Sequence, residues 1–71
     1  MNDERIVLVK GNTLVEIKID SLNGEVRVVH LTDGVVTSNN TADALALKSS
    51  ANEFATTVAN LLTADGFKVL G

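Results

Sequence analysis

Three turn dipeptides divide the first half of this chain into segments of strand length, and they leave little choice of fold. Gly11-Asn12, Asn23-Gly24 and Asp33-Gly34 are pairs that close tight β-hairpins, because glycine and asparagine tolerate the positive φ angles of such turns. The segments between them are rich in β-branched residues and alternate apolar with polar side chains. The pattern predicts antiparallel strands at residues 5–10, 13–20 and 25–32, with a short fourth strand at 35–37.

A helical pattern follows the strands. Its apolar residues recur in steps of three and four, which is the spacing of one helical face. They are Ala44, Leu47, Ala51, Phe54, Val58 and Leu61, and the face is widened by Leu45, Ala55, Ala59 and Leu62. Asn40 is the expected N-cap, with Asp43 three residues on and close to the positive end of the helix dipole. Gly66 is the expected stop, so the sequence favours a helix over Thr41–Thr63.

The start of this helix has a second interpretation. Ser50-Ala-Asn-Glu53 is itself a capping-box pattern, so the helix could begin at Ser50 with residues 43–48 extended. Both starts lead to the same fold class. We expect an α+β fold: an antiparallel β-meander of three to four strands, one helix packed on one face, and a short C-terminal strand at residues 67–70 on a sheet edge. The 71 residues form a single domain, 1–71.

The two-residue turns fix the strand register, and the register fixes the faces of the sheet. A Gly11-Asn12 turn places Ile6 opposite Ile17, and an Asn23-Gly24 turn places Asp20 opposite Arg27 as an exposed ion pair. The face assigned to the helix then carries Ile6, Leu8, Val15, Ile17, Ile19, Val26 and Val28. The side chains expected to be among the most costly to truncate are Ile17, Leu47, Phe54 and Val58.

The opposite face of the predicted sheet is also apolar, although one helix cannot cover both faces. It carries Val7, Val9, Leu14, Val29 and Leu31, together with Val36 if the fourth strand forms. A contiguous apolar patch on a small protein usually marks an interface, so we interpret these residues as a homodimer interface. The alternative is burial within the chain, by the C-terminal strand, by a shifted register, or with a β-bulge near Val28-Val29.

Residues able to carry chemistry are few, and their spacing suggests no catalytic, cofactor or metal site. His30 is expected beside Ile17 on the core face, with no nucleophile near it in sequence. Asp43, Glu53 and Asp65 are too widely spaced to converge on a metal. The chain has no cysteine, which excludes disulfides and thiolate metal sites and leaves packing or association as the source of stability. We expect a protein that is not an enzyme.

Two functions follow as hypotheses. The first is a small interaction module that homodimerises through the outer sheet face, with an unknown protein partner also allowed. The second is a nucleic-acid-associated regulator or accessory protein, such as those of mobile elements, using Arg5, Lys18 and Arg27. The net charge of −3 and the absence of Trp and Tyr disfavour nucleic acid. The expected location is cytoplasmic, with no membrane span and no signal peptide.

Overall fold

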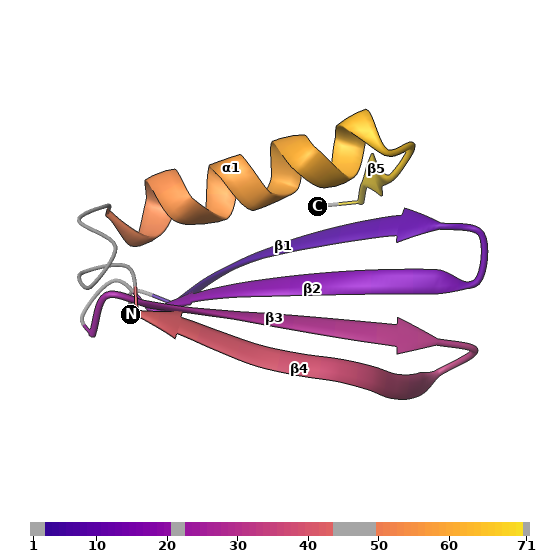
Figure 1. Ribbon diagram of the computed structural model, residues 1–71, viewed down its shortest axis with the longest axis horizontal. Helices are drawn as coiled ribbons and strands as arrows, with labels where there is room; N and C mark the ends of the chain where they lie inside the picture. Colours follow the sequence, from indigo (N-terminus) through magenta and orange to yellow (C-terminus); the bar gives the residue numbers. More distant parts are fainter. Residues whose placement is uncertain (1–2, 21–22, 44–49, 71) are drawn as a thin grey trace.

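The computed structural model describes residues 3–20, 23–43 and 50–70. Within them the chain forms β1 (Asp3–Lys10), β2 (Thr13–Asp20), β3 (Glu25–Thr32), β4 (Val35–Asp43), α1 (Ala51–Ala64) and β5 (Lys68–Val69). The strands make one antiparallel sheet in the order β4-β3-β2-β1-β5, and α1 lies across one face of it (Figure 1). The predicted α+β meander is confirmed.

Two of the three hairpins close as the sequence predicts. Lys10 pairs with Thr13 around Gly11, whose φ of 58° is positive. Thr32 pairs with Val35 around Asp33 and Gly34, which have φ angles of 53° and 80°. Two positive angles in a row are the requirement of a type I′ turn, which explains the Asp-Gly pair at this position.

The register of the β2–β3 hairpin differs from the prediction. Asp20 pairs with Glu25, and Arg27 pairs with Lys18, so the expected Asp20–Arg27 ion pair is wrong. The carboxylate of Asp20 instead accepts hydrogen bonds from the backbone N–H of Asn23 at 3.2 Å and from its side-chain Nδ2 at 2.7 Å. These bonds hold Asn23 against the end of β2, and the connection between Asp20 and Glu25 is longer than the two-residue turn predicted. The slip is two residues, so every side chain keeps its predicted face.

The boundary between β4 and α1 is the largest correction. Residues 41–43 belong to a nine-residue strand, so the favoured helix over Thr41–Thr63 is wrong and the start at Ser50 is right. The extended stretch predicted with that start lies, beyond Asp43, outside the described residues. Ser50 is the N-cap, and its Oγ accepts from the backbone N–H of Glu53 at 3.1 Å. Thr41 and Asp43 extend the pairing with β3, where sheet hydrogen bonds replace those of a helical turn. Asn40 and Asp43 therefore do not cap the helix.

Two smaller expectations also change. The β-bulge is not at Val28-Val29: His30 pairs with Ser38 while Leu31 pairs with Val36, which leaves Thr37 as the extra residue on β4. The last strand is at a sheet edge, as predicted, and pairs with β1. It extends the sheet sideways and does not fold across the outer face, so the suggestion that the C-terminal strand buries that face is wrong.

The core lies between α1 and the face of the sheet assigned to it. Its buried side chains are Leu8, Val15, Ile17, Ile19, Val26, Ala51, Ala55 and Ala59. Three alanines one turn apart let the helix approach the sheet closely, while Phe54, Val58 and Leu62 pack around them half-buried. Leu61, expected on the core face, is 67% exposed. Ile17 is fully buried, as predicted, whereas Leu47 lies outside the described residues.

Candidate interaction surface

The sheet face opposite α1 brings together all five of the residues predicted as an interface. Cross-strand pairing places Val9, Leu14, Leu31 and Val36 side by side, one from each of β1 to β4. Val7 and Val29 lie in the neighbouring row, on either side of Glu16. We call Val7, Val9, Leu14, Val29, Leu31 and Val36 the apolar patch. No described element covers this face, because α1 and β5 lie elsewhere (Figure 1).

The patch is only partly shielded by its own members. Five of its side chains are half-buried by their neighbours, and Val36 on the edge strand is 55% exposed. Leu70, 64% exposed, adjoins the patch at the other edge, where its backbone N–H donates to the Val7 carbonyl at 2.7 Å. In a two-layer fold, the sheet face that is exposed to water normally carries polar residues. This face is apolar instead, which is typical of a surface that binds another molecule.

Glu16 is the single charge inside the patch, and two cations neutralise it. Its two carboxylate oxygens lie 3.3 Å from an Arg5 guanidinium nitrogen and 3.4 Å from the Lys18 ammonium. The Glu16 side chain is only 23% exposed to solvent. Burying a carboxylate is costly unless it is paired, so these two contacts make the centre of the face compatible with an apolar partner.

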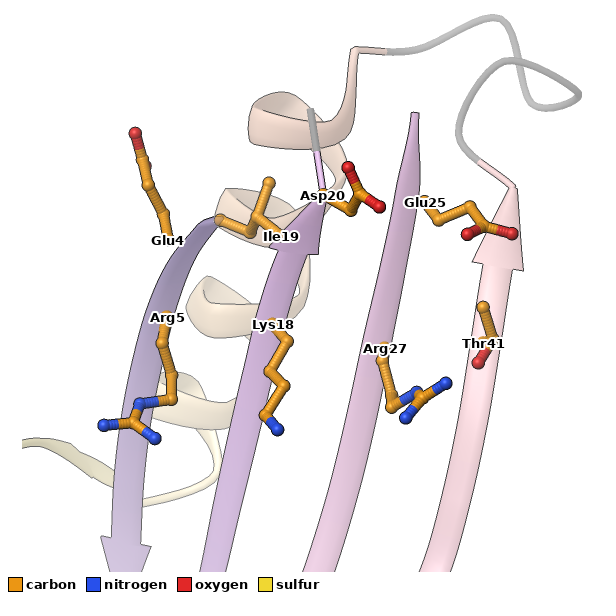
Figure 2. A pocket seen from close by; sticks show the side chains of 8 residues that line it. All are labelled: Glu4, Arg5, Lys18, Ile19, Asp20, Glu25, Arg27 and Thr41. Carbon is orange, nitrogen blue, oxygen red and sulfur yellow. The ribbon is translucent and has the colours of Figure 1, made fainter. Parts of the chain in front are cut away.

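A row of bases borders the patch on the side away from the Gly11-Asn12 turn. Arg5, Lys18 and Arg27 are direct cross-strand neighbours, and Thr41 continues the row on β4. We call the three cations the base row. They line a hollow of about 520 Å³. The side chains of Arg5 and Lys18 extend along the strands away from Asp20, and that of Arg27 turns toward β4 (Figure 2).

A row of acids follows at the end of the sheet. Asp20, Glu25 and Asp43 are cross-strand neighbours, and we call them the acid row. Like charges directly opposite one another destabilise a sheet slightly, but the base row lies one step away along the strands and offsets this repulsion. The outer face is thus ordered along the strands as acid row, base row and apolar patch, ending in the turns at Gly11-Asn12 and Asp33-Gly34.

Arg27 differs from the other two members of the base row. Arg5 and Lys18 both bind Glu16, whereas Arg27 is exposed and makes no ion pair or side-chain hydrogen bond within the described part of the chain. Asp33, in the turn that follows the same strand, is also exposed, and its carboxylate has no partner among those residues. Sequence reasoning missed this arrangement, because it placed Arg27 opposite Asp20. The signal that could have revealed it is Asp20 three residues before Asn23, where its carboxylate accepts from the backbone and side-chain N–H groups of that residue.

The remaining candidate residues lie apart from one another. His30 is half-buried on the helix side of the sheet, beside Val15 rather than Ile17. Asp43 ends β4, Glu53 is in the first turn of α1, and Asp65 is the helix C-cap. Across residues 3–20, 23–43 and 50–70, no group of three His, Cys, Asp or Glu side chains is placed to hold a metal ion.

Comparison with known proteins finds no protein-family model, no curated protein and no solved structure that matches this chain. Within the described residues, the only α-helix, α1, is too short and too polar to cross a membrane. The function must therefore be inferred from the geometry of the outer sheet face.

Proposed function

We propose that this protein is a small non-enzymatic interaction module that homodimerises through its outer sheet face. The observation that carries the proposal is the apolar patch, which lies on the face that α1 leaves uncovered. A second copy is the simplest occupant, because it supplies an equally flat apolar face of the same width. Two sheets stacked in this way form the core of a β-sandwich, with about 10 Å between the layers.

The size of the face sets the expected affinity. Four strands about 4.8 Å apart span roughly 19 Å, and the stretch from the base row to the far turns is roughly 20 Å long. Two such faces bury on the order of 800 Å² together, which is below the 1,200–2,000 Å² or so of standard interfaces. We therefore expect a reversible dimer with a dissociation constant in the micromolar range or weaker, rather than an obligate one.

Sedimentation equilibrium over a wide concentration range tests the proposal. The mass should rise from the 7.5 kDa monomer toward twice that value as the concentration increases. A monomer at the highest concentration reached would refute the dimer.

A pair of matched variants locates the interface. Val9→Glu places a charge within the patch and should dissociate the dimer, because a buried unpaired carboxylate is costly. Leu61→Glu makes the same kind of change on an exposed position of α1 and should leave the dimer intact. Circular dichroism of both variants checks the fold. Equal dimerisation of Val9→Glu and the unmodified protein would place the interface elsewhere.

A nucleic-acid-associated regulator is the second candidate, and the base row favours it. Arg5, Lys18 and Arg27 lie side by side in one hollow, where they could contact phosphates. The acid row and the two contacts to Glu16 weaken this possibility. A gel shift with short DNA and RNA at low salt, where phosphate contacts are strongest, is the test. Absence of a shift there would remove this candidate, and Arg27→Gln should weaken any shift that appears.

A further inference from the structure

We infer that the two copies stack with their strands antiparallel, so that Arg27 of each copy lies over Asp33 of the other. This inference rests on the proposed dimer and specifies its geometry. The two-fold axis would lie between the sheets and cross the strands at right angles, midway between the two rows of the apolar patch. Each dimer would then contain two equivalent Arg27–Asp33 ion pairs, one at each end of the interface.

The charges of the outer face decide between the two aligned ways of stacking identical sheets. A two-fold axis parallel to the strands places each row of one molecule over the same row of the second molecule. An axis between β2 and β3, for example, sets Lys18 over Arg27 and Asp20 over Glu25 of the second copy. Like charges facing each other across an interface are strongly unfavourable. That arrangement is therefore excluded by the base row and the acid row together.

An axis across the strands avoids this conflict. It reverses the strand direction of the second copy, so that the row containing Val29 stacks on the row containing Leu31. On β1 and β3 the apolar patch then covers itself, while Leu14 and Val36 lie over Glu16 and Asn39 of the second copy. The base row of each copy extends over the turns of the other, and the acid row lies beyond the overlap, in water. No base faces a base, and no acid faces an acid.

The spacing along β3 identifies the ion pair. The centre of the patch on this strand is between Val29 and Leu31, at the level of His30. Arg27 lies three residues before that level and Asp33 lies three residues after it, so the axis exchanges their positions. Within one chain they are separated by six residues, or about 20 Å of strand, and cannot pair. They can meet only between copies.

The same symmetry explains why Arg27 is the member of the base row that has no ion pair in its own chain. On β1 and β2 the axis sets Arg5 and Lys18 over the second copy's turn Gly11-Asn12, which carries no charge. Those two cations bind Glu16 of their own chain instead. Only the turn at the end of β3 contains an acid. The one member of the base row without a partner in the described chain is thus the one that would face a carboxylate across the interface.

Charge-reversal variants test the inference in trans. Arg27→Glu alone sets the introduced carboxylate against Asp33 in both pairs, and Asp33→Lys alone sets the introduced ammonium against Arg27 in both. Each variant should dimerise about tenfold more weakly than the unmodified protein. A mixture of the two variants replaces one of the two repulsive contacts by an attractive Glu–Lys contact and restores the original Arg27–Asp33 pair at the other end. The mixture should therefore form a heterodimer with nearly the affinity of the unmodified dimer. Native mass spectrometry distinguishes this heterodimer from both homodimers by its mass.

Controls separate this geometry from general effects. Glu25→Lys changes the net charge by the same amount as Asp33→Lys, but it lies in the acid row outside the overlap and should not weaken the dimer. Since Asp33 has a positive φ of 53°, Asp33→Asn, which tolerates that angle, provides a second variant if Asp33→Lys does not fold. Asp33→Asn and Arg27→Gln each remove one charge of the pair, and each should weaken the affinity of the dimer about threefold.

Each outcome decides one question. Single variants that weaken the dimer, with recovery in the mixture, support the antiparallel arrangement. Single variants that dimerise as tightly as the unmodified protein, or a mixture that stays weak, overturn it while the dimer itself stands. An unmodified protein that remains monomeric refutes the proposed function and this inference together.

Discussion

Lys10 joins the end of β1 to the end of α1, and its removal gives a quantitative test of how the helix is held. Its ammonium donates to the Asp65 carbonyl at 2.7 Å and lies 3.6 Å from the Asp65 carboxylate. It also lies 5.8 Å from the centre of the Phe67 ring. The last turn of α1 contains no basic residue, so Lys10 supplies from another element the cation that the negative end of the helix dipole favours.

The expected cost of Lys10→Met follows from these contacts. A hydrogen bond from a charged donor contributes about 1.5–3 kcal/mol when buried, but the Lys10 side chain is 50% exposed, which reduces that value. The exposed cation–π contact contributes about 0.5–1 kcal/mol, and the exposed carboxylate contact less. Since one ammonium makes all three contacts, they do not simply add. We expect the free energy of unfolding to fall by about 1–2 kcal/mol.

Urea denaturation followed by circular dichroism measures this loss. A midpoint shift with an unchanged slope would indicate a change in stability alone. In a thermal scan, about 1 kcal/mol corresponds to a melting shift of about 4–8 °C for a domain of this size. All variants need the same protein concentration, because dimerisation adds to the apparent stability.

The matched control for Lys10→Met is Lys68→Met, at an exposed lysine whose side chain makes no ion pair or hydrogen bond in the described part of the chain. Because Lys68 lies opposite Val9 at the edge of the apolar patch, both variants are compared at a concentration where the protein is monomeric. It should change the stability by less than about 0.5 kcal/mol. Equal stabilities for the two variants would refute the conclusion that Lys10 anchors the helix.

Three further substitutions test the fold. Ser50→Ala removes the helix N-cap and should lower the free energy of unfolding, measured by urea denaturation, by about 1 kcal/mol. Asn40→Ala, on the exposed edge strand, should lower it by less than about 0.5 kcal/mol. A larger effect at Asn40 than at Ser50 would indicate a helix that begins earlier. Ala55→Leu should cost about 1–3 kcal/mol, because the fully buried Ala55 has no room for a larger side chain. Ile17→Ala empties a fully buried position and should cost about 2–5 kcal/mol, enough to unfold much of the protein in a thermal scan.

The faces of the sheet were predictable from the sequence because they depend only on alternation. Ile17 and Leu14 point to opposite faces whichever residues lie across from them, and a register slip of two residues leaves that unchanged. The composition of the apolar patch was therefore predicted although the β2–β3 register was wrong. The charges were not predictable in the same way, since the neighbours of Arg27 depend on the register, and the register depends on the turn that Asp20 and Asn23 form.

The helix start was ambiguous for a different reason. Asn40 and Ser50 both satisfy the local requirements of an N-cap, so no local rule separates them. The choice is made by β3, whose residues Glu25 and Arg27 offer backbone partners to Asp43 and Thr41. The face of α1 was predicted except for Leu61. Ala51, Ala55 and Ala59 pack on the sheet as the spacing indicates, but Leu61, placed on the same face, is 67% exposed, because the sheet packs most closely where the side chains are small.

The placement of charge constrains the proposed function more than the apolar patch does. An apolar patch of two rows is compatible with several ways of stacking two sheets, because apolar contact has no direction. The charged rows remove that freedom. Glu16 in the patch requires two cations, Arg5 and Lys18, to be tolerable under a partner, and this leaves Arg27 as the member of the base row that is free to contact another molecule. The side chains of Arg27 and Asp33 have no partner among the described residues and lie equally far along the chain from the centre of the apolar patch, so they can pair between copies only when the second copy runs antiparallel.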